Sequence, residues 1–499
     1  MIFTRYRVDN SNLSICRLLP DFIPFAPWRW WIHQRQVFLP MSYIYSKRYV
    51  HPLTKLTRDL RNELLSQPYE TINFSTYRNA VCERDNYYPK TWILNSITWI
   101  LANVWNPYLR TEKLSKAAER WTYELIQRED INSDYADLAP VNAPLNTVAC
   151  FIEEGPDSYA VRRHRERLPE FLWVKDEGML VNGTNGVQTW DTSFLIQAVV
   201  AAGLAQDEKW KPMLIRALEF LEDQQIRENC LDQEKYYRHP RKGAWPFSTR
   251  IQGYTVSDCT SEAMKSVLEL QALSDYPKLL SDERLQEAVD ILLTMQNPSG
   301  GLASYEPTRA SEKLEWLNAA EVFGRIMVEY DYPECTTAAV TALQLFHKQY
   351  PSYRSEEITR FIERAVDYIR RAQRSDGSWF GSWGICFSYA GMFALESLAA
   401  VGESCANSER IRRACAFFID RRKADGGWGE SYRSCELGVW VDHEMSQVVQ
   451  TAWVCIALMH AGYEDLEPIR AGLRLIMRRQ QANGEWLQEA IEGVFNKST

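Results

Sequence analysis

Residues 373–379 read QRSDGSW, and this pattern of a Gln, a Gly and a closing Trp recurs along the chain. Related elements are RKADGGW at 422–428, QQANGEW at 480–486, GAW at 243–245, GVQTW at 186–190 and a degenerate copy, QNPSGGL, at 296–302. The elements are commonly about 50–60 residues apart, a spacing within the range of known repeat architectures. The C-terminal two thirds of the chain is therefore predicted to be built from repeats.

The pattern has a physical interpretation. We expect a helix to end at the Gln and the Gly to supply a turn conformation that is closed to most other residues. The Trp then covers the end of a helix pair, and its indole N–H needs a partner. We interpret Trp379, Trp428 and Trp486 as structural clamps of this kind.

Between these elements the apolar residues recur with the 3.6-residue period of helices. The expected helices include 192–204, 261–273, 283–295, 355–373, 408–423, 445–462 and 466–480. Two helices per repeat describe an all-α fold, either an α/α barrel or an α-solenoid. Few stretches alternate strictly between polar and apolar residues, so we expect little β-structure.

Composition excludes several functional classes. The net charge of −8, without a long basic run, argues against nucleic acid as a partner. The 11 Cys never form a C-x-x-C pair, so a zinc motif lacks its usual spacing and free thiols in a reducing compartment are expected. No phosphate-binding or dinucleotide fingerprint occurs. Aromatic residues, with 18 Trp, 25 Tyr and 19 Phe, suit a stable core or an aromatic-lined cavity.

The run VSDCTSE, residues 256–262, carries the candidate chemistry. An Asp just before an apolar helix is typically an N-cap, which is one interpretation of Asp258. The other is a proton donor, because Cys259 offers a thiol and Phe247 and Tyr254 lie close upstream. A carboxyl group in an aromatic pocket is held protonated by desolvation.

This combination resembles the oxidosqualene cyclases, the lanosterol synthase family, over essentially the whole chain. Asp258 and Cys259 fall on the acid and the Cys of the family's D-C-T-A-E motif, with Ser261 in place of the usual Ala. Further matches are Glu262, His33 in WWIHQRQVFLPMSY, Tyr305 in SYEPTR, Cys335 in YPECTTAAV, and the aromatic residues Trp190, Phe247, Phe323 and Trp383.

The resemblance implies a function. Asp258 would protonate the epoxide of oxidosqualene, with Cys259 and Cys335 beside it and Glu262 restoring its proton through water. His33 and Tyr305 would stabilise the last cation or take the final proton, and the four aromatic residues would stabilise earlier cations. The product would be lanosterol or a related tetracyclic triterpene, formed without a cofactor or a metal ion. A single Asp, in place of the D-x-D-D acid of squalene–hopene cyclases, fits an epoxide substrate.

The resemblance also implies a domain organisation. Residues 1–170 would form part of a first α/α barrel, with a membrane-facing or substrate-entry segment. Residues 171–499 would form a second barrel that carries the acid. Family members are longer at both ends, so we expect an incomplete second barrel and a chain that cyclises poorly alone. The alternatives are an inactive homologue and, more remotely, a non-catalytic α/α-barrel interaction protein.

The segment at 18–43, LLPDFIPFAPWRWWIHQRQVFLPMSY, is strongly apolar and aromatic. It suits either packing between domains or a membrane-facing surface. No apolar run reaches the roughly 20 residues that span a bilayer. We expect peripheral, monotopic association with an intracellular membrane, such as the endoplasmic reticulum or a lipid droplet, through Leu18–Trp31.

Overall fold

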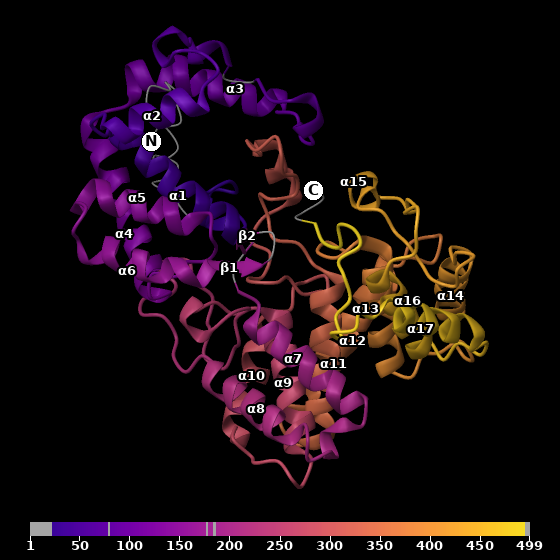
Figure 1. Ribbon diagram of the computed structural model, residues 1–499. Helices are drawn as coiled ribbons and strands as arrows, with labels where there is room; N and C mark the ends of the chain where they lie inside the picture. Colours follow the sequence, from indigo (N-terminus) through magenta and orange to yellow (C-terminus); the bar gives the residue numbers. More distant parts are fainter. Residues whose placement is uncertain (1–21, 78–79, 176–177, 183–185, 495–499) are drawn as a thin grey trace. The chain divides into compact units, whose positions relative to one another are not determined.

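The computed structural model describes residues 22–77, 80–175, 178–182 and 186–494 (Figure 1). The chain divides into two compact units. Unit 1 comprises Met1–Gly186 and Arg309–Val328, and unit 2 comprises Val187–Thr308 and Glu329–Thr499. Both units are predominantly helical, so the expected all-α fold class is confirmed.

Unit 1 is built around α1 (Ile32–Lys47), which packs against α4 and α5. Its other helices are α2 (Lys55–Leu64), α3 (Trp92–Ile100), α4 (Glu112–Asn132), α5 (Asn142–Glu154) and α6 (Tyr159–Arg167). A π-helical segment, η6 (Leu101–Leu109), continues α3. Strands β1 (Leu172–Lys175) and β2 (Gly178–Val181) form an antiparallel pair in which Leu172 lies opposite Val181. The short 3₁₀ turns of this unit are η2 (Pro27–Arg29), η3 (Tyr69–Thr71), η4 (Phe74–Tyr77), η5 (Glu83–Asp85), η7 (Leu168–Phe171) and η10 (Glu312–Leu317).

Unit 2 has two layers of helices. The inner series packs in chain order, each helix against the next, as α7 (Gln188–Ala201), α9 (Ser257–Gln271), α11 (Pro333–Gln349), α13 (Cys386–Ala400) and α16 (Val448–His460). The outer helices, each packed on an inner one, are α8 (Lys211–Gln224), α10 (Asp282–Thr294), α12 (Ser355–Ala372), α14 (Glu409–Ile419) and α17 (Glu467–Arg479). The remaining elements are α15 (Arg433–Leu437), η8 (Leu204–Gln206) and η9 (Arg250–Gln252). This alternation of inner and outer helices is the α/α-barrel arrangement.

The Trp clamps form as the sequence predicts. The indole N–H of Trp379 donates to the carbonyl oxygen of Ile369 at 2.8 Å, and that of Trp428 donates to Phe418 at 2.7 Å. In both cases the acceptor lies ten residues upstream, near the end of the outer helix. Both indoles are 0% exposed, whereas Trp486, which makes the same bond to Ile476, is 43% exposed.

The Gly of the pattern is required by the turn. Gly377 has φ +93°, and a Cβ there would lie 2.5 Å from the carbonyl oxygen of Arg413. Gly426 has φ +94° and a Cβ would lie 2.9 Å from the Cβ of Ala471. Any larger residue would meet both backbone strain and a close contact at these turns.

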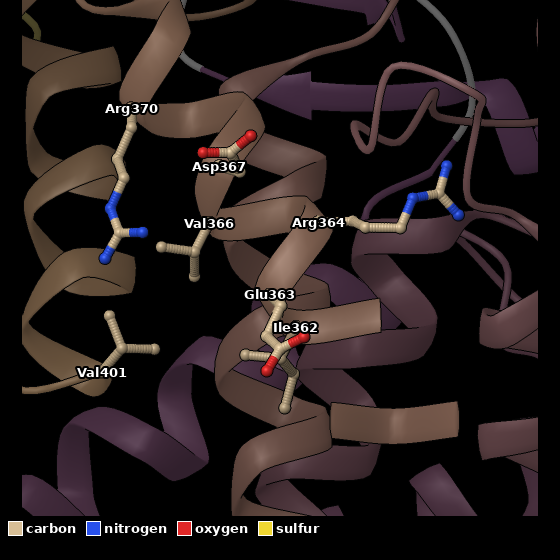
Figure 2. A pocket seen from close by; sticks show the side chains of 7 residues that line it. All are labelled: Ile362, Glu363, Arg364, Val366, Asp367, Arg370 and Val401. Atoms are coloured by element: carbon tan, nitrogen blue, oxygen red, sulfur yellow. The ribbon is translucent and has the colours of Figure 1, made fainter. Parts of the chain in front are cut away.

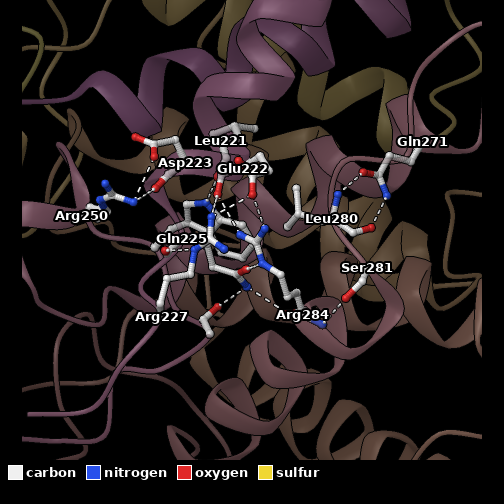
Figure 3. A network of polar contacts seen from close by, with 12 residues as sticks. Leu221, Glu222, Asp223, Gln225, Arg227, Arg250, Gln271, Leu280, Ser281 and Arg284 are labelled. Carbon is white, nitrogen blue, oxygen red and sulfur yellow. Dashed lines mark hydrogen bonds and ion pairs between the residues drawn. The ribbon is translucent and has the colours of Figure 1, made fainter.

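A Gln at the C-cap of an outer helix, Gln225 after α8 and Gln373 after α12, links that helix to the next outer helix. The side chain of Gln225 donates to Gly243 across its own turn and to Arg284 in α10, both at 2.9 Å (Figure 3). The guanidinium of Arg284 returns a bond to the side-chain oxygen of Gln225 at 2.7 Å. Gln373 repeats this arrangement with Gly377 and Arg410, so the Gln fastens consecutive outer helices together.

The expected helices are present, with boundaries that differ by a few residues. The helix predicted at 261–273 begins four residues earlier, at Ser257, and the one predicted at 408–423 ends at Ile419. The element GVQTW differs from the other copies because Trp190 lies inside the first turn of α7. No helix of the described residues is long and apolar enough to cross a membrane.

Candidate active site

The first turn of α9 positions Asp258. Val256 occupies the N-cap position and Asp258 is the second residue of the helix, so its interpretation as an N-cap is wrong. The turn is fixed by Ser257, whose backbone N–H donates to Ser304 at 2.8 Å and whose hydroxyl donates to Ala303 at 2.6 Å. These bonds also hold the segment that leads into Tyr305.

The carboxyl group of Asp258 is buried and hydrogen-bonded on both oxygens. Its Oδ1 accepts from the backbone N–H of Cys259 at 2.9 Å, and its Oδ2 accepts from the thiol of Cys335 at 3.5 Å. Desolvation raises the pKa of Asp258 to about 6, although these two bonds oppose the shift. The result is an acid that is stronger than burial alone would leave it and weaker than an exposed Asp.

Two thiols lie beside this carboxyl group. Burial raises the pKa of Cys259 and of Cys335 well above the usual range, so both stay neutral S–H groups. Cys335, in the first turn of α11, makes the predicted thiol bond to Asp258. Cys259 donates its backbone N–H to this carboxyl group, and its thiol, which the sequence suggested as a donor, is buried beside the same group.

Aromatic rings extend from the acid along unit 2. Tyr305 is 3% exposed, and burial raises the pKa of its phenol well above 10. Its ring centroid lies 6.2 Å from that of Phe247 and 6.3 Å from that of Tyr254. Phe247 in turn lies 5.7 Å from Trp190. Three of the residues matched from the sequence therefore form one continuous aromatic series.

Trp383 belongs to the loop before α13, where its ring centroid lies 5.0 Å from that of Tyr332. Tyr332 is the N-cap residue of α11 and so precedes Cys335 by three positions. The structure thereby places Trp383 against the same helix start as the second thiol.

A second buried acid, Glu334, was missed by sequence reasoning. Its Oε1 accepts from the backbone N–H of Ser382 at 2.8 Å, and desolvation raises its pKa to about 7, with a smaller contribution from Asp258. Tyr389 of α13, which is half-buried, has its pKa raised by desolvation and then by Glu334 and Asp258. A signal was present, because Glu334-Cys-Thr repeats the acid-Cys-Thr order of Asp258-Cys-Thr at the start of the next inner helix.

Glu262 lies one turn along α9 from Asp258 in a buried polar network. Its Oε2 accepts from Gln197 at 2.7 Å and forms an ion pair with Lys265 at 2.9 Å. Lys265 also lies 3.4 Å from Glu396, whose side chain is 23% exposed. Desolvation raises the pKa of Glu262, while Lys265 opposes the shift. The network joins the buried Glu262 to a carboxylate that reaches solvent.

His33 and Phe323 belong to unit 1. His33 lies in the first turn of α1, and burial lowers its pKa to about 3, so its imidazole is neutral at physiological pH. Phe323 is 38% exposed, and its carbonyl oxygen accepts from Asn318 at 2.7 Å. The predicted pairing of His33 with Tyr305 of unit 2 stays a prediction.

A hollow of about 450 Å³ lies on the outer helix α12 (Figure 2). Its lining comprises Ile362, Glu363, Arg364, Val366, Asp367, Arg370 and Val401. The lining combines two Arg and two acidic residues with three apolar side chains. None of these residues belongs to the cluster around Asp258. We assign it no part in the candidate chemistry.

Residues 187–497 match the family model described as the squalene-hopene cyclase C-terminal domain. The match includes Asp258, Cys335, Glu262 and Tyr305, which are the residues of the buried cluster in unit 2. The chain belongs to the oxidosqualene cyclase family.

Relatives in this cyclase family match nearly the whole chain. Lanosterol synthases erg7A and erg7B of Aspergillus fumigatus are 64% and 63% identical, each over 96% of the chain. Lanosterol synthase ERG7 of Gibberella zeae is 59% identical over 96% of the chain. The chain covers 64%, 68% and 63% of these three proteins, so it spans less than two thirds of erg7A and of ERG7.

Proposed function

We propose that this protein is an isomerase that converts (S)-2,3-oxidosqualene to lanosterol or a related tetracyclic triterpene by acid-initiated cyclisation. The observation that carries this proposal is the state of Asp258. It is a buried carboxyl group with a pKa of about 6, bonded by the Cys335 thiol and followed by a series of aromatic rings. The lanosterol synthases among the relatives point to the same substrate class.

Asp258 acts as the general acid. Its O–H donates a proton to the epoxide oxygen, the C–O bond breaks, and an alkene π-bond attacks the carbon that becomes electron-deficient. The N–H of Cys259 and the S–H of Cys335 stabilise the carboxylate that remains. Because both bonds favour the charged form, they make the acid strong enough to open an epoxide.

The aromatic series then stabilises the migrating positive charge. Trp190, Phe247 and Tyr305 present ring faces, each worth about 2 kcal/mol toward a desolvated cation. A ring stabilises the charge without forming a bond to it, so the cascade continues. Phe323 and Trp383 are assigned the same role on their match to the family's aromatic positions.

His33 and Tyr305 are proposed to act at the end of the cascade. With its pKa lowered to about 3, the imidazole of His33 is a neutral base that accepts the final proton. Tyr305 keeps its phenol proton and so contributes a dipole and a ring face, not a negative charge. A charged base would end the cascade early.

The test is turnover of (S)-2,3-oxidosqualene by the detergent-solubilised protein, with the products identified by gas chromatography and mass spectrometry. Formation of a tetracyclic alcohol, even at the low turnover expected of this chain alone, would support the proposal. Asp258→Asn should lower turnover by at least about 100-fold, the usual scale for a general acid, while the exposed Asp275→Asn control retains it. A folded protein that forms no cyclic product would instead support the catalytically impaired homologue.

We also propose that the protein associates with one leaflet of an intracellular membrane and takes its water-insoluble substrate from the bilayer. Phe22 and Phe25 are 80% and 48% exposed, and in α3 Trp92 and Trp99 are 75% and 61% exposed. Of the segment Leu18–Trp31, residues 18–21 lie outside the described part of the chain. Trp30 and Trp31 are buried inside unit 1 and Trp28 is half-buried, so Phe22 and Phe25 are the most exposed aromatic residues of the segment.

A further inference from the structure

A second cluster of titratable side chains lies in unit 1. Asp130 of α4, Cys150 of α5, His164 of α6 and Asp137 of the loop between α4 and α5 lie close together. Helix α5 packs against both α4 and α6 (Figure 1). All four are buried, with exposures from 0% for Cys150 to 5% for His164. The proposed cyclisation uses none of them.

The atoms of this cluster approach one another closely. Oδ2 of Asp130 lies 3.4 Å from Sγ of Cys150 and 3.4 Å from Nε2 of His164. One ligand atom from each of these three residues lies within 4.8 Å of the others. On the other side of the imidazole, Nδ1 lies 3.7 Å from Oδ2 of Asp137.

Several of these buried atoms lack a hydrogen-bond partner. Both ring nitrogens of His164, Oδ2 of Asp137 and Oδ1 of Asn146 are buried and make no hydrogen bond. Buried polar groups are normally paired, because an unpaired one loses its hydration without compensation. An imidazole whose nitrogens make no hydrogen bond, although Asp130 and Asp137 lie 3.4 Å and 3.7 Å from them, is the second observation that points to a ligand.

We propose that Asp130, Cys150 and His164 bind a zinc ion through Oδ2, Sγ and Nε2. The fourth position of a tetrahedral site is left to a water molecule. Asp137 is then a positioning residue that accepts a hydrogen bond from Nδ1–H of His164. Asn146 positions Asp130 through the 2.8 Å bond from its Nδ2 to Oδ1 of that carboxylate.

Two of the three separations match zinc geometry. Zn–S bonds of about 2.3 Å and Zn–N and Zn–O bonds of about 2.0 Å, applied to the two pairs 3.4 Å apart, give angles of about 105–115°, close to tetrahedral. The third pair, Sγ of Cys150 and Nε2 of His164, lies within 4.8 Å and would close further around the ion. One thiolate, one imidazole and one carboxylate form a donor set for a borderline metal ion, unlike the all-oxygen sets of Mg²⁺ and Ca²⁺. A His held by a carboxylate on its other nitrogen is the usual outer-shell arrangement of zinc ligands.

The cluster brings together the groups that bind a divalent ion. Two carboxyl groups and a thiol lie against one imidazole in a buried site, so the ion would be surrounded by donor atoms of the protein. On binding, the proton of the Cys150 thiol, and any proton on Asp130, pass to solvent.

The frame around the cluster is already rigid. Asp134, at the start of the loop, is held by ion pairs to Arg163 and Arg167 of α6. Asp137 is fixed by a 3.0 Å bond from its backbone N–H to the hydroxyl of Ser133. A zinc ion here therefore joins three helices and the loop, and its role is to stabilise unit 1 independently of the chemistry at Asp258.

The test is the metal content of the purified full chain, followed by cobalt substitution. We expect about one zinc per chain after desalting. After removal of zinc with a chelator, Co²⁺ should give the visible bands of a four-coordinate ion and a thiolate-to-cobalt charge-transfer band. The charge-transfer band should vanish in Cys150→Ser and persist in Cys455→Ser, a buried Cys of α16.

Two outcomes would overturn the proposal. One is wild-type protein that is metal-free, gains no cobalt spectrum and shows the same melting temperature with zinc as with chelator, which would leave a hydrogen-bonded cluster. The other is zinc that remains at full content in both Cys150→Ser and His164→Gln, which would place it elsewhere. Because the wild-type measurements need no substitution, a variant that fails to fold does not obscure the result.

Discussion

A carboxyl group that starts a cation cascade has to satisfy two opposed requirements. It must stay protonated until substrate arrives, and it must then give up its proton to a weakly basic oxygen. Burial of Asp258 serves the first requirement, and the N–H of Cys259 and the S–H of Cys335 serve the second. The pKa of about 6 is the balance between them.

This balance has a cost in stability with a definite pH dependence. The folded-state pKa of Asp258 lies about two units above its usual value. The contribution of Asp258 to the free energy of unfolding is therefore fully present below pH 4 and is lost as pH rises through 6. Asp258→Asn removes that loss. At pH 8 we expect the free energy of unfolding of the variant to exceed that of wild type by about 3 kcal/mol. At pH 4 the two free energies of unfolding should be equal.

Denaturant unfolding at the two pH values measures this difference. If Asp258→Asn raised the free energy of unfolding equally at both pH values, Asp258 would not be the titrating group. The wild-type kcat/KM should also fall as pH rises above about 6, because only the protonated form is the acid.

His33 and Tyr305 should control which product forms. Removing a group that acts late leaves the early cyclisation intact but lets the last cation rearrange or lose its proton elsewhere. His33→Ala and Tyr305→Ala should therefore yield incompletely cyclised or rearranged alcohols at a nearly unchanged rate of substrate loss. Product profiles by mass spectrometry that match wild type in both variants would contradict the assignment.

Glu262 should matter between turnovers. If it returns the proton to Asp258, the first turnover of protonated enzyme does not need it. Glu262→Gln should then leave the single-turnover rate within about threefold of wild type and lower the steady-state rate by about 10–100-fold, within the range for proton transfer. Equal losses in both rates would assign Glu262 to the first protonation or to the fold.

At the scale of elements, the Gln-Trp pattern joins outer helices by side-chain hydrogen bonds. Trp428 and Trp486 make the same bond to the carbonyl ten residues upstream, but only Trp428 is buried. Trp428→Phe should lower the free energy of unfolding by about 2–3 kcal/mol, from a lost buried bond and a small cavity. Trp486→Phe, the matched control, should cost less than about 1 kcal/mol. If thermal or denaturant unfolding showed similar losses of stability for Trp428→Phe and Trp486→Phe, the clamp interpretation would be contradicted.

The elements were largely predictable from the sequence, because helix period and Gly turns are local signals. The predicted helices recur with ends shifted by a few residues, as for α9, which starts at Ser257. Residues whose role depends on packing were not predictable. Glu334 and Lys265 look like ordinary surface charges in the sequence. Only the fold reveals that both are buried, Glu334 close to Asp258 and Lys265 against Glu262.

The zinc cluster shows the same limit. Its three ligands come from α4, α5 and α6 and follow no C-x-x-C or His-x-His spacing. Sequence reasoning tests short-range patterns, whereas this site depends on three helices meeting. Asp258 was found because its motif is local, with Cys259 and Glu262 inside one helical turn.

At the scale of the whole molecule, the proposed chemistry draws on both units. The acid, its thiols and most aromatic residues belong to unit 2, whereas His33 and Phe323 belong to unit 1. A substitution that disturbs only the fold of unit 1 should then change products more than it changes epoxide opening. Unit 1 also carries the exposed aromatic residues that we assign to the membrane.

Membrane association should be sensitive to those residues. The transfer of an aromatic side chain from water into the interface is favourable, and a Glu in its place reverses the preference. The wild-type chain should sediment with phosphatidylcholine vesicles. The double substitution Phe22→Glu with Phe25→Glu should weaken this binding by at least about tenfold, as expected for losing two apolar anchors from the lipid. Tyr159→Glu, at a 61% exposed position of α6, is the matched control and should bind like wild type.

If the double variant binds as tightly as wild type but Trp92→Glu does not, α3 is the contact instead. Wild-type protein that stays entirely in the supernatant without detergent would contradict membrane association itself.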